Sequence, residues 1–286
     1  KLRALIMEAI DLNIKDFNLR YTLECGQVFR WYERNDWYYG VVKDKIIKIA
    51  QTKYRVLFQI YPEDNDFGIE EYFRLDDDLQ YIRNIINKDE IINKAINQLT
   101  GLRLIRQDPW ECLISYVCSK QNQIPKIKNT IFNLSKNFGQ KIQFDNKYFY
   151  TFPKPAQIVN ADLEDLVKCN FRFGIKQASE IQKIAKLVLE SKFDLEKLEK
   201  LDYYTGKERL MSLHGVGHKI ADCVLLFSLD KLEAFPVDTW IRKIMQKYYF
   251  LKNSSDDSIR SFARSYFGKY AGYAQEYLYY YFRGTI

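Results

Sequence analysis

Lys219 and Asp238 are the two residues whose types and positions could support covalent chemistry. Lys219 follows two glycines one residue apart, Gly215 and Gly217, and falls in the first turn of an expected helix. A cation is unfavourable at a helix N-terminus, where the positive end of the dipole favours the unprotonated and therefore nucleophilic amine. A contact between Lys219 and a phosphate is the alternative. The placement therefore raises the hypothesis of an amine nucleophile and leaves the alternative open.

Asp238 stands at the start of another expected helix, in the segment Pro236-Val237-Asp238. Capping that helix is the ordinary role of an aspartate at such a position. The two roles can coexist, because backbone N–H groups at a helix start can hold a carboxylate ionised. An ionised carboxylate near an amine nucleophile can stabilise positive charge on a sugar carbon and assist proton transfer.

The segment around the two glycines predicts a helix over 207–213, a tight turn, and a second helix over 219–228. Glycines let the backbone approach a partner closely, and the free N–H groups that start the second helix can bind a phosphate. On the two glycines alone, an ordinary turn between two helices remains an alternative.

Composition indicates a globular protein with a polyanionic partner. The chain has 286 residues, 47% of them hydrophobic, and a formal net charge of +7, which allows one large or two to three small domains. No apolar run is long enough to span a bilayer, and residues 1–7 lack the apolar stretch and cleavage site of a signal peptide. We therefore expect a cytoplasmic, nucleoid-associated protein.

Cysteine and histidine usage argues against several kinds of site. The 5 cysteines are scattered, with no Cys-x-x-Cys pair, so neither disulfides nor a zinc or iron–sulfur cluster is indicated. The 2 histidines, His214 and His218, both lie in the glycine-containing hairpin, which disfavours a Ser-His-Asp triad.

Hydrophobic periodicity predicts an α+β chain, with a small antiparallel sheet followed by helices. The expected strands are 16–23, 27–33, 37–42, 45–51 and 54–61. Besides the hairpin, the expected helices are 69–74, 78–87, 89–99, 109–119, 124–138, 155–159, 161–166, 175–190, 194–200, 238–249, 255–267 and 271–282. Residues 138–155 are expected to form a loop, and Asp108 is expected to cap the helix that begins at Pro109.

These motifs resemble the helix-hairpin-helix superfamily of DNA base-excision glycosylases, and especially its 8-oxoguanine DNA glycosylase branch. The resemblance rests on LHGVGHKIADC at 213–223 followed by PVD at 236–238. Three more blocks occur in the family's order: CGQVFRW at 25–31, GLRLIRQDP at 101–109 and YAGYAQ at 270–275. Because the blocks extend over nearly the whole chain, the match is more specific than the hairpin alone.

The resemblance implies a catalytic pair. Lys219 would attack the anomeric carbon of the sugar, expel the damaged base and form a Schiff base, after which β-elimination nicks the strand. Asp238 would support that step. The partner implied is double-stranded DNA containing 8-oxoguanine, bound by a monomer.

The resemblance also implies a set of base-binding residues. The Gly26 carbonyl would accept from the N7–H that oxidised guanine has and guanine lacks. Cys223 would stack on one face of the extruded base and Tyr279 on the other, while Gln275 bonds the Watson–Crick edge and Pro236 completes the base-binding set. The alternatives are a plain turn at Gly26 and an amphipathic helix with an aromatic core stripe at 275–279.

The implied DNA-binding residues depart from the family pattern at several positions. The wedge and the two arginines that read the orphaned cytosine align with Phe173, Lys126 and Gly174. Glycine cannot read a base edge and lysine is only a point charge, so we expect weaker discrimination of the opposite base. A family histidine is replaced by Trp240. The full set is Gln121, Asn122, Lys126, Phe173, Gly215, Gly217, His218 and Trp240.

On the same resemblance, no cofactor is required and no iron–sulfur cluster is expected. A sodium, potassium or calcium ion could bind main-chain carbonyls of Met211, Leu213 and Val216 at the hairpin. The implied organisation is an N-terminal antiparallel domain like half of a TATA-binding protein (1–100), a helical domain with the hairpin (101–235) and closing helices (236–286).

Two other functions remain open. A related glycosylase could remove an alkylated purine, which Gly26 and the Gln275/Tyr279 pair argue against. A non-catalytic DNA-binding protein would make Lys219 and Asp238 incidental, which the presence of both disfavours.

Overall fold

The computed structural model describes residues 8–11, 16–53, 55–64, 66–249 and 252–283. They form two compact units, each assembled from segments distant in the sequence. The sheet unit takes residues 1–15, 28–68 and 114–194, and the helical unit takes residues 16–27, 69–113 and 195–286. The domain boundaries expected near residues 100 and 235 stay a prediction.

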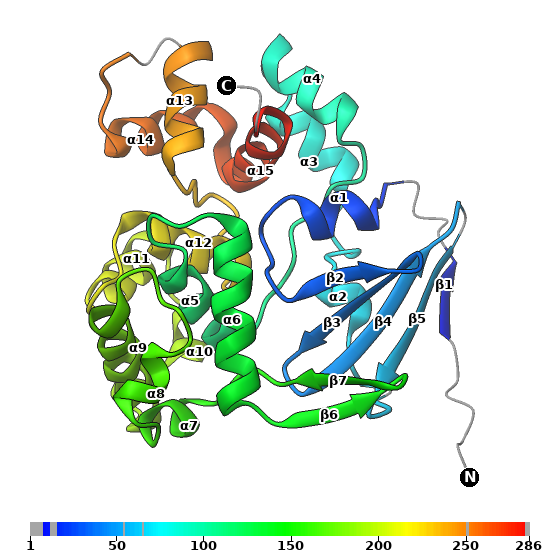
Figure 1. Ribbon diagram of the computed structural model, residues 1–286. Helices are drawn as coiled ribbons and strands as arrows, with labels where there is room; N and C mark the ends of the chain where they lie inside the picture. Colours follow the sequence, from blue (N-terminus) through cyan, green and yellow to red (C-terminus); the bar gives the residue numbers. More distant parts are fainter. Residues whose placement is uncertain (1–7, 12–15, 54, 65, 250–251, 284–286) are drawn as a thin grey trace. The chain divides into compact units, whose positions relative to one another are not determined.

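The sheet unit is built on an antiparallel five-stranded sheet in the order β1-β5-β4-β3-β2 (Figure 1). In β5, Val56, Phe58 and Ile60 are buried and alternate with more exposed neighbours, as expected of a strand with one face on a core. The strands are β1 (Glu8–Asp11), β2 (Trp31–Arg34), β3 (Trp37–Val42), β4 (Lys45–Gln51) and β5 (Arg55–Tyr61).

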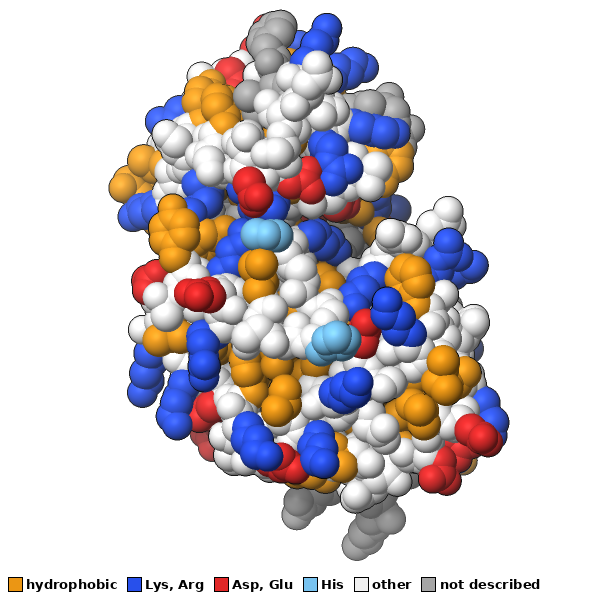
Figure 2. Space-filling model, turned by 90° about the vertical axis from the view of Figure 1, so that its left-hand side faces the viewer, with side chains coloured by type: hydrophobic (Ala, Val, Ile, Leu, Met, Phe, Trp, Pro, Cys, Tyr) orange, Lys and Arg blue, Asp and Glu red, His pale blue; other side chains and the backbone are white. Residues whose placement is uncertain are grey.

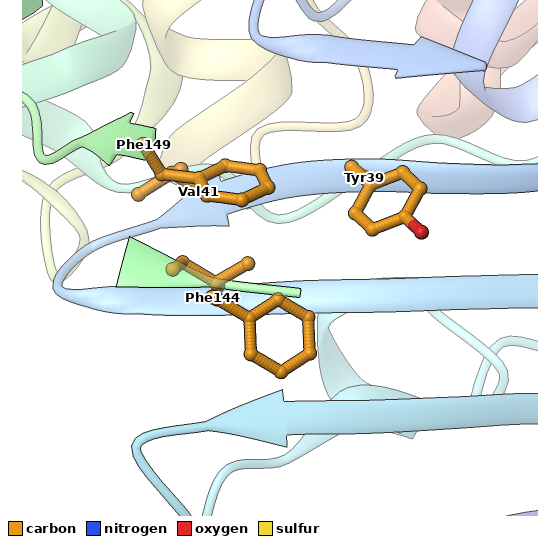
Figure 3. Packing of buried hydrophobic residues seen from close by; sticks show 5 residues of the cluster. Tyr39, Val41, Phe144 and Phe149 are labelled. Atoms are coloured by element: carbon orange, nitrogen blue, oxygen red, sulfur yellow. The ribbon is translucent and has the colours of Figure 1, made fainter. Parts of the chain in front are cut away.

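The expected loop over 138–155 is wrong, because most of it forms a hairpin of β6 (Lys141–Phe144) and β7 (Lys147–Tyr150). Asp145 and Asn146 at its tip have φ of 51° and 57°, the conformation that two-residue hairpin turns require. Phe144 and Phe149 of the hairpin then pack against residues of the sheet (Figure 3), namely Tyr39, Val41 and Ile46.

The sheet unit also holds α6 (Ile124–Phe138), α7 (Pro155–Val159), α8 (Leu163–Val167) and α9 (Gly174–Leu189), with α7 and α8 packed on α9. Helix α5 (Pro109–Cys118) contributes residues to both units. Its expected cap is confirmed, since the Glu111 N–H donates to Asp108 Oδ1 over 2.9 Å.

The helical unit surrounds α15 (Ala271–Phe282), which packs against α3, α4, α13 and α14. Most of α15 is buried. The other helices are α1 (Leu19–Glu24), α2 (Ile69–Tyr72), α3 (Leu79–Ile86), α4 (Glu90–Gln98), α10 (Leu195–Leu198), α11 (Tyr203–Met211), α12 (His218–Ser228), α13 (Thr239–Tyr248), α14 (Asp256–Phe267) and the 3₁₀ turn η1 (Gly268–Tyr270). Every helix expected here is present, with its ends shifted by a few residues.

Two expected strands near the N-terminus are wrong. Residues 16–23 hold helix α1 instead, because the Asn18 side chain accepts from the Tyr21 N–H over 2.9 Å and caps it. The buried face of this helix consists of Leu19, Thr22 and Leu23. Of 27–33 only the end is a strand, and the strand expected from 54 begins at Arg55, since residue 54 lies outside the described residues.

The predicted α+β class is confirmed: an antiparallel sheet from the N-terminal part is followed by mostly helical chain. None of the helices in the described ranges is long and apolar enough to cross a membrane.

Candidate active site

The turn between α11 and α12 presents the start of α12 without a side-chain cap. Gly215 has a φ of 86°, the left-handed region that favours glycine. Gly217 caps α12 in an extended conformation, and a Cβ added there would meet no atom within 4 Å. The first N–H groups of α12 therefore have the geometry of a phosphate-binding helix N-terminus.

Helix α12 is held in place by a buried ion cluster on Asp222, which is itself fully buried. Lys207 of α11 brings its Nζ to 2.9 Å from Asp222 Oδ1, and the Tyr203 hydroxyl donates to the same oxygen over 2.7 Å. Arg260 of α14 lies 3.5 Å from Asp222 Oδ2. The two hairpin helices and α14 thus share one buried carboxylate, which fixes the helix that carries Lys219.

Lys219 is the second residue of α12 and is half-buried. Asp238 caps α13, as predicted, by accepting from the Ile241 N–H over 2.8 Å. Burial raises the pKa of Asp238, while the cap hydrogen bond and the positive charge of Lys219 act in the opposite direction. The two residues therefore interact electrostatically, and Asp238 is a stronger base than a surface aspartate.

The candidate base-binding residues of α12 and α15 belong to the same unit. Cys223 lies one turn after Lys219 and is 2% exposed, and burial raises the pKa of its thiol to about 12, so it stays a neutral, polarisable group. On α15, Gln275 is buried and its Oε1 has no hydrogen-bond partner among the described residues, and Tyr279 follows one turn later. Pro236 is buried just before Asp238.

Gly26 has a φ of 115° and directly follows α1 and Cys25. Its neighbour Gln27 is 1% exposed and ties this segment to a distant one. Gln27 Nε2 donates to the carbonyl of Arg103 over 2.8 Å, and Gln27 Oε1 accepts from the Ile105 N–H over 2.9 Å. Gln27 therefore joins the sequence blocks at 25–31 and 101–109 and explains why residues 27–30 are not a strand.

Arg283, at the end of α15, holds the same segment from another side. Its Nη1 donates to the Cys25 carbonyl over 2.9 Å and its Nη2 to the Glu24 carbonyl over 3.2 Å. The roles of Gln27 and Arg283 were not anticipated from the sequence. Gln27 lies inside a family block, which is a signal that could have identified it, whereas no local pattern marks Arg283.

Four candidate DNA-binding residues lie in the sheet unit and not with the catalytic pair. Gln121 is an exposed turn residue with a φ of 46°, and Asn122 follows it. Lys126 is exposed on α6, and Phe173 is 41% exposed at the N-cap of α9.

The remaining DNA-binding candidates flank the catalytic pair in the helical unit. The chain has two histidines, and Figure 2 shows both on one face, with basic and acidic side chains around them. The His218 Nδ1 lies 3.7 Å from Asp257 Oδ1. Trp240, in the first turn of α13, is half-buried with the Lys243 ammonium 5.3 Å from its ring centre.

The hairpin offers main-chain oxygens to a cation. Among the described residues there is no group of three or more histidine, cysteine, aspartate or glutamate side chains that could hold a metal. Met211 ends α11, and the Leu213 carbonyl accepts from the Val216 N–H over 3.1 Å, which leaves it a second lone pair. Carbonyl oxygens at a helix end suit sodium, potassium or calcium, so this donor set fits the expected ion.

Comparison with known proteins covers nearly all of the chain. Residues 9–113 match the N-terminal domain of 8-oxoguanine DNA glycosylase, and residues 114–268 match the HhH-GPD superfamily of base excision DNA repair proteins. A probable N-glycosylase/DNA lyase of Methanothermobacter thermautotrophicus is 32% identical over 227 residues, 74% of this chain and 72% of that protein.

Two further relatives agree. The N-glycosylase/DNA lyase of Saccharomyces cerevisiae is 29% identical over 269 residues, 83% of this chain and 70% of that protein. The crystal structure of the Clostridium acetobutylicum 8-oxoguanine glycosylase/lyase, bound to duplex DNA with cytosine opposite 8-oxoguanine, has a TM-score of 0.89 and 32% identity and covers 98% of each chain. The chain therefore belongs to the HhH-GPD superfamily of base excision DNA repair proteins and carries the N-terminal domain of 8-oxoguanine DNA glycosylases.

Proposed function

We propose that the chain is a bifunctional DNA glycosylase and AP lyase that removes 8-oxoguanine from duplex DNA. The observation that carries the proposal is the pairing of Lys219, at the start of an uncapped helix, with Asp238 at the N-cap of α13. Relatives named as N-glycosylase/DNA lyases and as an 8-oxoguanine glycosylase/lyase support it.

The reaction uses side chains alone and needs no cofactor. The neutral Lys219 amine attacks C1′ of the damaged nucleotide, a C–N bond forms, and the glycosidic bond breaks with its electron pair leaving on the base. The sugar ring then opens to a protonated Schiff base between C1′ and Nζ. Loss of a C2′ proton allows the 3′-phosphate to leave, which nicks the strand.

Asp238 acts on the charge that develops during these steps. Base departure makes C1′ and the ring oxygen partly positive, and a carboxylate nearby stabilises that state more than the ground state. The raised pKa of Asp238 also suits it to accept a proton.

Recognition of the base follows from donors and acceptors. The Gly26 carbonyl accepts from N7–H of 8-oxoguanine, whereas guanine would present an N7 lone pair to the same oxygen. Gln275, whose buried Oε1 has no partner among the described residues, takes the Watson–Crick edge. Cys223 and Tyr279 cover the two faces of the base, with Pro236 beside them.

DNA is held by the hairpin and by residues of the sheet unit. The N–H groups after Gly215 and Gly217 contact a phosphate together with His218 and Trp240. An ion on the carbonyls of Met211, Leu213 and Val216 would add positive charge to that phosphate contact. Action on chromosomal DNA fits a monomer that works at the nucleoid.

Borohydride trapping tests the proposal. Wild type, Lys219→Gln and Lys94→Gln are incubated with a duplex carrying one 8-oxoguanine, and Lys94 is the control because it is an exposed lysine of α4. We expect a covalent adduct with wild type and Lys94→Gln and none with Lys219→Gln. An adduct that persists in Lys219→Gln, or none with wild type, contradicts the proposed mechanism.

A further inference from the structure

Gln177 is a fully buried polar side chain of α9, and no step of the proposed chemistry uses it. It lies four residues after Phe173, the exposed aromatic residue at the N-cap of the same helix. A buried amide is costly to the fold unless its donor and acceptor groups are hydrogen-bonded. The partners of Gln177 therefore indicate what this side chain does.

Gln177 binds two main-chain groups that lie far apart in the sequence. Its Oε1 accepts from the Phe173 N–H over 3.3 Å, and its Nε2 donates to the Val117 carbonyl over 2.7 Å. Val117 is fully buried in the last turn of α5. Gln177 thus ties the N-cap of α9 to the end of α5.

The backbone next to Phe173 is irregular, which makes this tie important for the direction of the ring. Gly174, the first residue of α9, has a φ of 52°, in the left-handed region. The Phe173 side chain makes no capping hydrogen bond and is 41% exposed, so neither the helix nor packing fixes it fully. Gln177 holds the Phe173 N–H much as the N3 side chain of a capping box holds the N–H of its N-cap residue.

A second contact holds the end of α5 against α9. Glu180 lies one turn after Gln177, is 7% exposed, and brings its Oε2 to 2.6 Å from the Lys120 Nζ. The Lys120 N–H donates to the Val117 carbonyl over 3.4 Å, so both contacts meet at the turn over 119–122. Helix α9 therefore holds its own N-cap and this candidate DNA-binding turn in one arrangement.

We propose that Gln177 is a positioning residue for extrusion of the damaged base, which acts by holding Phe173 in place relative to the end of α5. This proposal rests on the proposed glycosylase function and on Phe173 as the wedge that the family resemblance implies. Extrusion costs the free energy of unstacking and unpairing the target base, and an apolar wedge inserts into the stack as the base leaves. A wedge that is already held in position loses less conformational freedom when it inserts.

The experiment compares two duplexes that differ in whether a base must be extruded. One carries 8-oxoguanine paired with cytosine, and the other carries a preformed abasic site, which has no base to unstack. The main variant is Gln177→Met, which keeps the length of the side chain but removes the amide. Gln182→Met is the matched control, because Gln182 lies on the same helix and donates to the Ala161 carbonyl over 2.9 Å.

Gln177→Met is expected to slow single-turnover excision of paired 8-oxoguanine about tenfold, because both hydrogen bonds are lost. Its cleavage of the abasic duplex is expected to stay within about twofold of wild type, because the chemistry on the sugar does not use Gln177. Gln182→Met should leave the ratio of the two rates unchanged.

Phe173→Ala removes the ring through which Gln177 is proposed to act. In this background Gln177→Met should slow excision by no more than about a further twofold, since effects that act through one side chain are not additive. If Gln177 supported only the fold, it would lower the rate by the same factor in both backgrounds.

Gln177→Asn guards against a main variant that folds poorly. It keeps an amide at this buried position, but its side chain is one methylene shorter and cannot bond both main-chain groups at once. Thermal melts identify which variants are folded at the assay temperature. Gln177→Asn should show the same selective loss of excision as Gln177→Met.

The proposal is overturned if both Gln177 variants slow the two reactions in parallel or leave excision unchanged. It is also overturned if Gln182→Met causes the same selective loss, or if the effects of Gln177→Met and Phe173→Ala multiply. Failure of the proposed function is distinct from all of these results, because wild type would then cleave neither duplex.

Discussion

At the scale of single residues, Asp238 combines a structural and a chemical role that two substitutions can separate. Asparagine can still accept the Ile241 N–H through its amide oxygen, so Asp238→Asn should keep the cap on α13. We expect its free energy of unfolding to stay within about 0.5 kcal/mol of wild type, whereas Asp238→Ala should lose about 1 kcal/mol.

Excision should nevertheless fall by about 100-fold or more in both Asp238 variants, because both lose the charge that stabilises the cationic sugar. Thermal melts and single-turnover excision rates measure the two effects. If Asp238→Asn excised 8-oxoguanine at the wild-type rate, the cap would be the only role of this residue.

Glu276 makes a second residue-level prediction, about stability. Burial raises the pKa of Glu276 in the folded state to about 7, above the 4.5 that is ordinary for a glutamate, so between these pH values the folded state binds more protons than the unfolded state. The free energy of unfolding therefore falls as pH rises from about 4.5 to about 7. We expect Glu276→Gln to remove this fall, a gain on the order of 3 kcal/mol at pH 8.

Urea titrations of wild type and Glu276→Gln at about pH 5 and about pH 8 measure this difference. The two proteins should differ more at the higher pH. An equal difference at both values would mean that Glu276 is not held protonated by the fold.

Among the candidate site residues, Lys219 and Asp238 are the ones that the sequence predicts most directly. Lys219 and Asp238 stand next to helix starts that glycines and a Pro-Val-Asp segment mark locally. Gln27 and Arg283 carry no such mark, since their partners lie 76 and 258 residues away. Contacts of that span are set by tertiary packing, which periodicity does not encode.

At the scale of elements, substitutions at two glycines can distinguish an effect on DNA binding from an effect on packing. Gly217 starts α12, and a Cβ there would meet no atom within 4 Å. Gly217→Ala should therefore keep the fold within about 1 kcal/mol but lower DNA affinity severalfold, because the methyl group stands where a phosphate approaches the N–H groups. Fluorescence anisotropy with labelled duplex measures the affinity.

Gly272 of α15 gives the contrasting variant. A Cβ there would overlap the Leu226 side chain of α12 and lie 3.0 Å from the Ala234 carbonyl oxygen. We expect Gly272→Ala to lose about 1 to 3 kcal/mol of stability. Equal loss of DNA affinity in well-folded Gly217→Ala and Gly272→Ala would count against a phosphate contact at Gly217.

The sequence predicts a helix or strand best where one face of the element is apolar and the residue that starts it is marked in the neighbouring sequence. Helices α5 and α6 agree with their expected ranges because Pro109 and Pro125 mark their starts, and α15 does so because 271–282 is rich in alanine, leucine and aromatic residues. Periodicity does not predict the β6–β7 hairpin, because its turn is Asp-Asn and each strand has only four residues. The sequence of α1 predicts a strand because its six residues are too few to show a helical period.

At the scale of the whole molecule, the residues proposed to read the base opposite the lesion belong to the sheet unit. Phe173 is 41% exposed, Lys126 is an exposed lysine, and Gly174 has a φ of 52° with no neighbour within 4 Å of an added Cβ. None of these residues can donate the two parallel hydrogen bonds that an arginine guanidinium donates to a base edge. We expect excision rates opposite cytosine, adenine, guanine and thymine to agree within about tenfold. One good bidentate contact to a base edge would produce a larger difference between bases.

Single-turnover excision on four duplexes that differ only in the opposite base measures this range. Lys126→Ala should weaken binding to all four duplexes alike and reduce the salt dependence of the affinity by about one charge. A strong preference for cytosine that Lys126→Ala abolishes would assign base reading to this lysine.

The segment that carries Gly26 comes near the start of the chain, yet it is completed by a residue near the other end. Arg283 reaches the Cys25 carbonyl across 258 positions, and residues 16–27 belong to the same unit as α15. During synthesis the ribosome releases Lys219 and Asp238 before α15, so the proposed catalytic pair emerges before the proposed base-binding residues of α15. We therefore expect closure of this long loop, which joins the Gly26 segment to α15, to be a late event in folding.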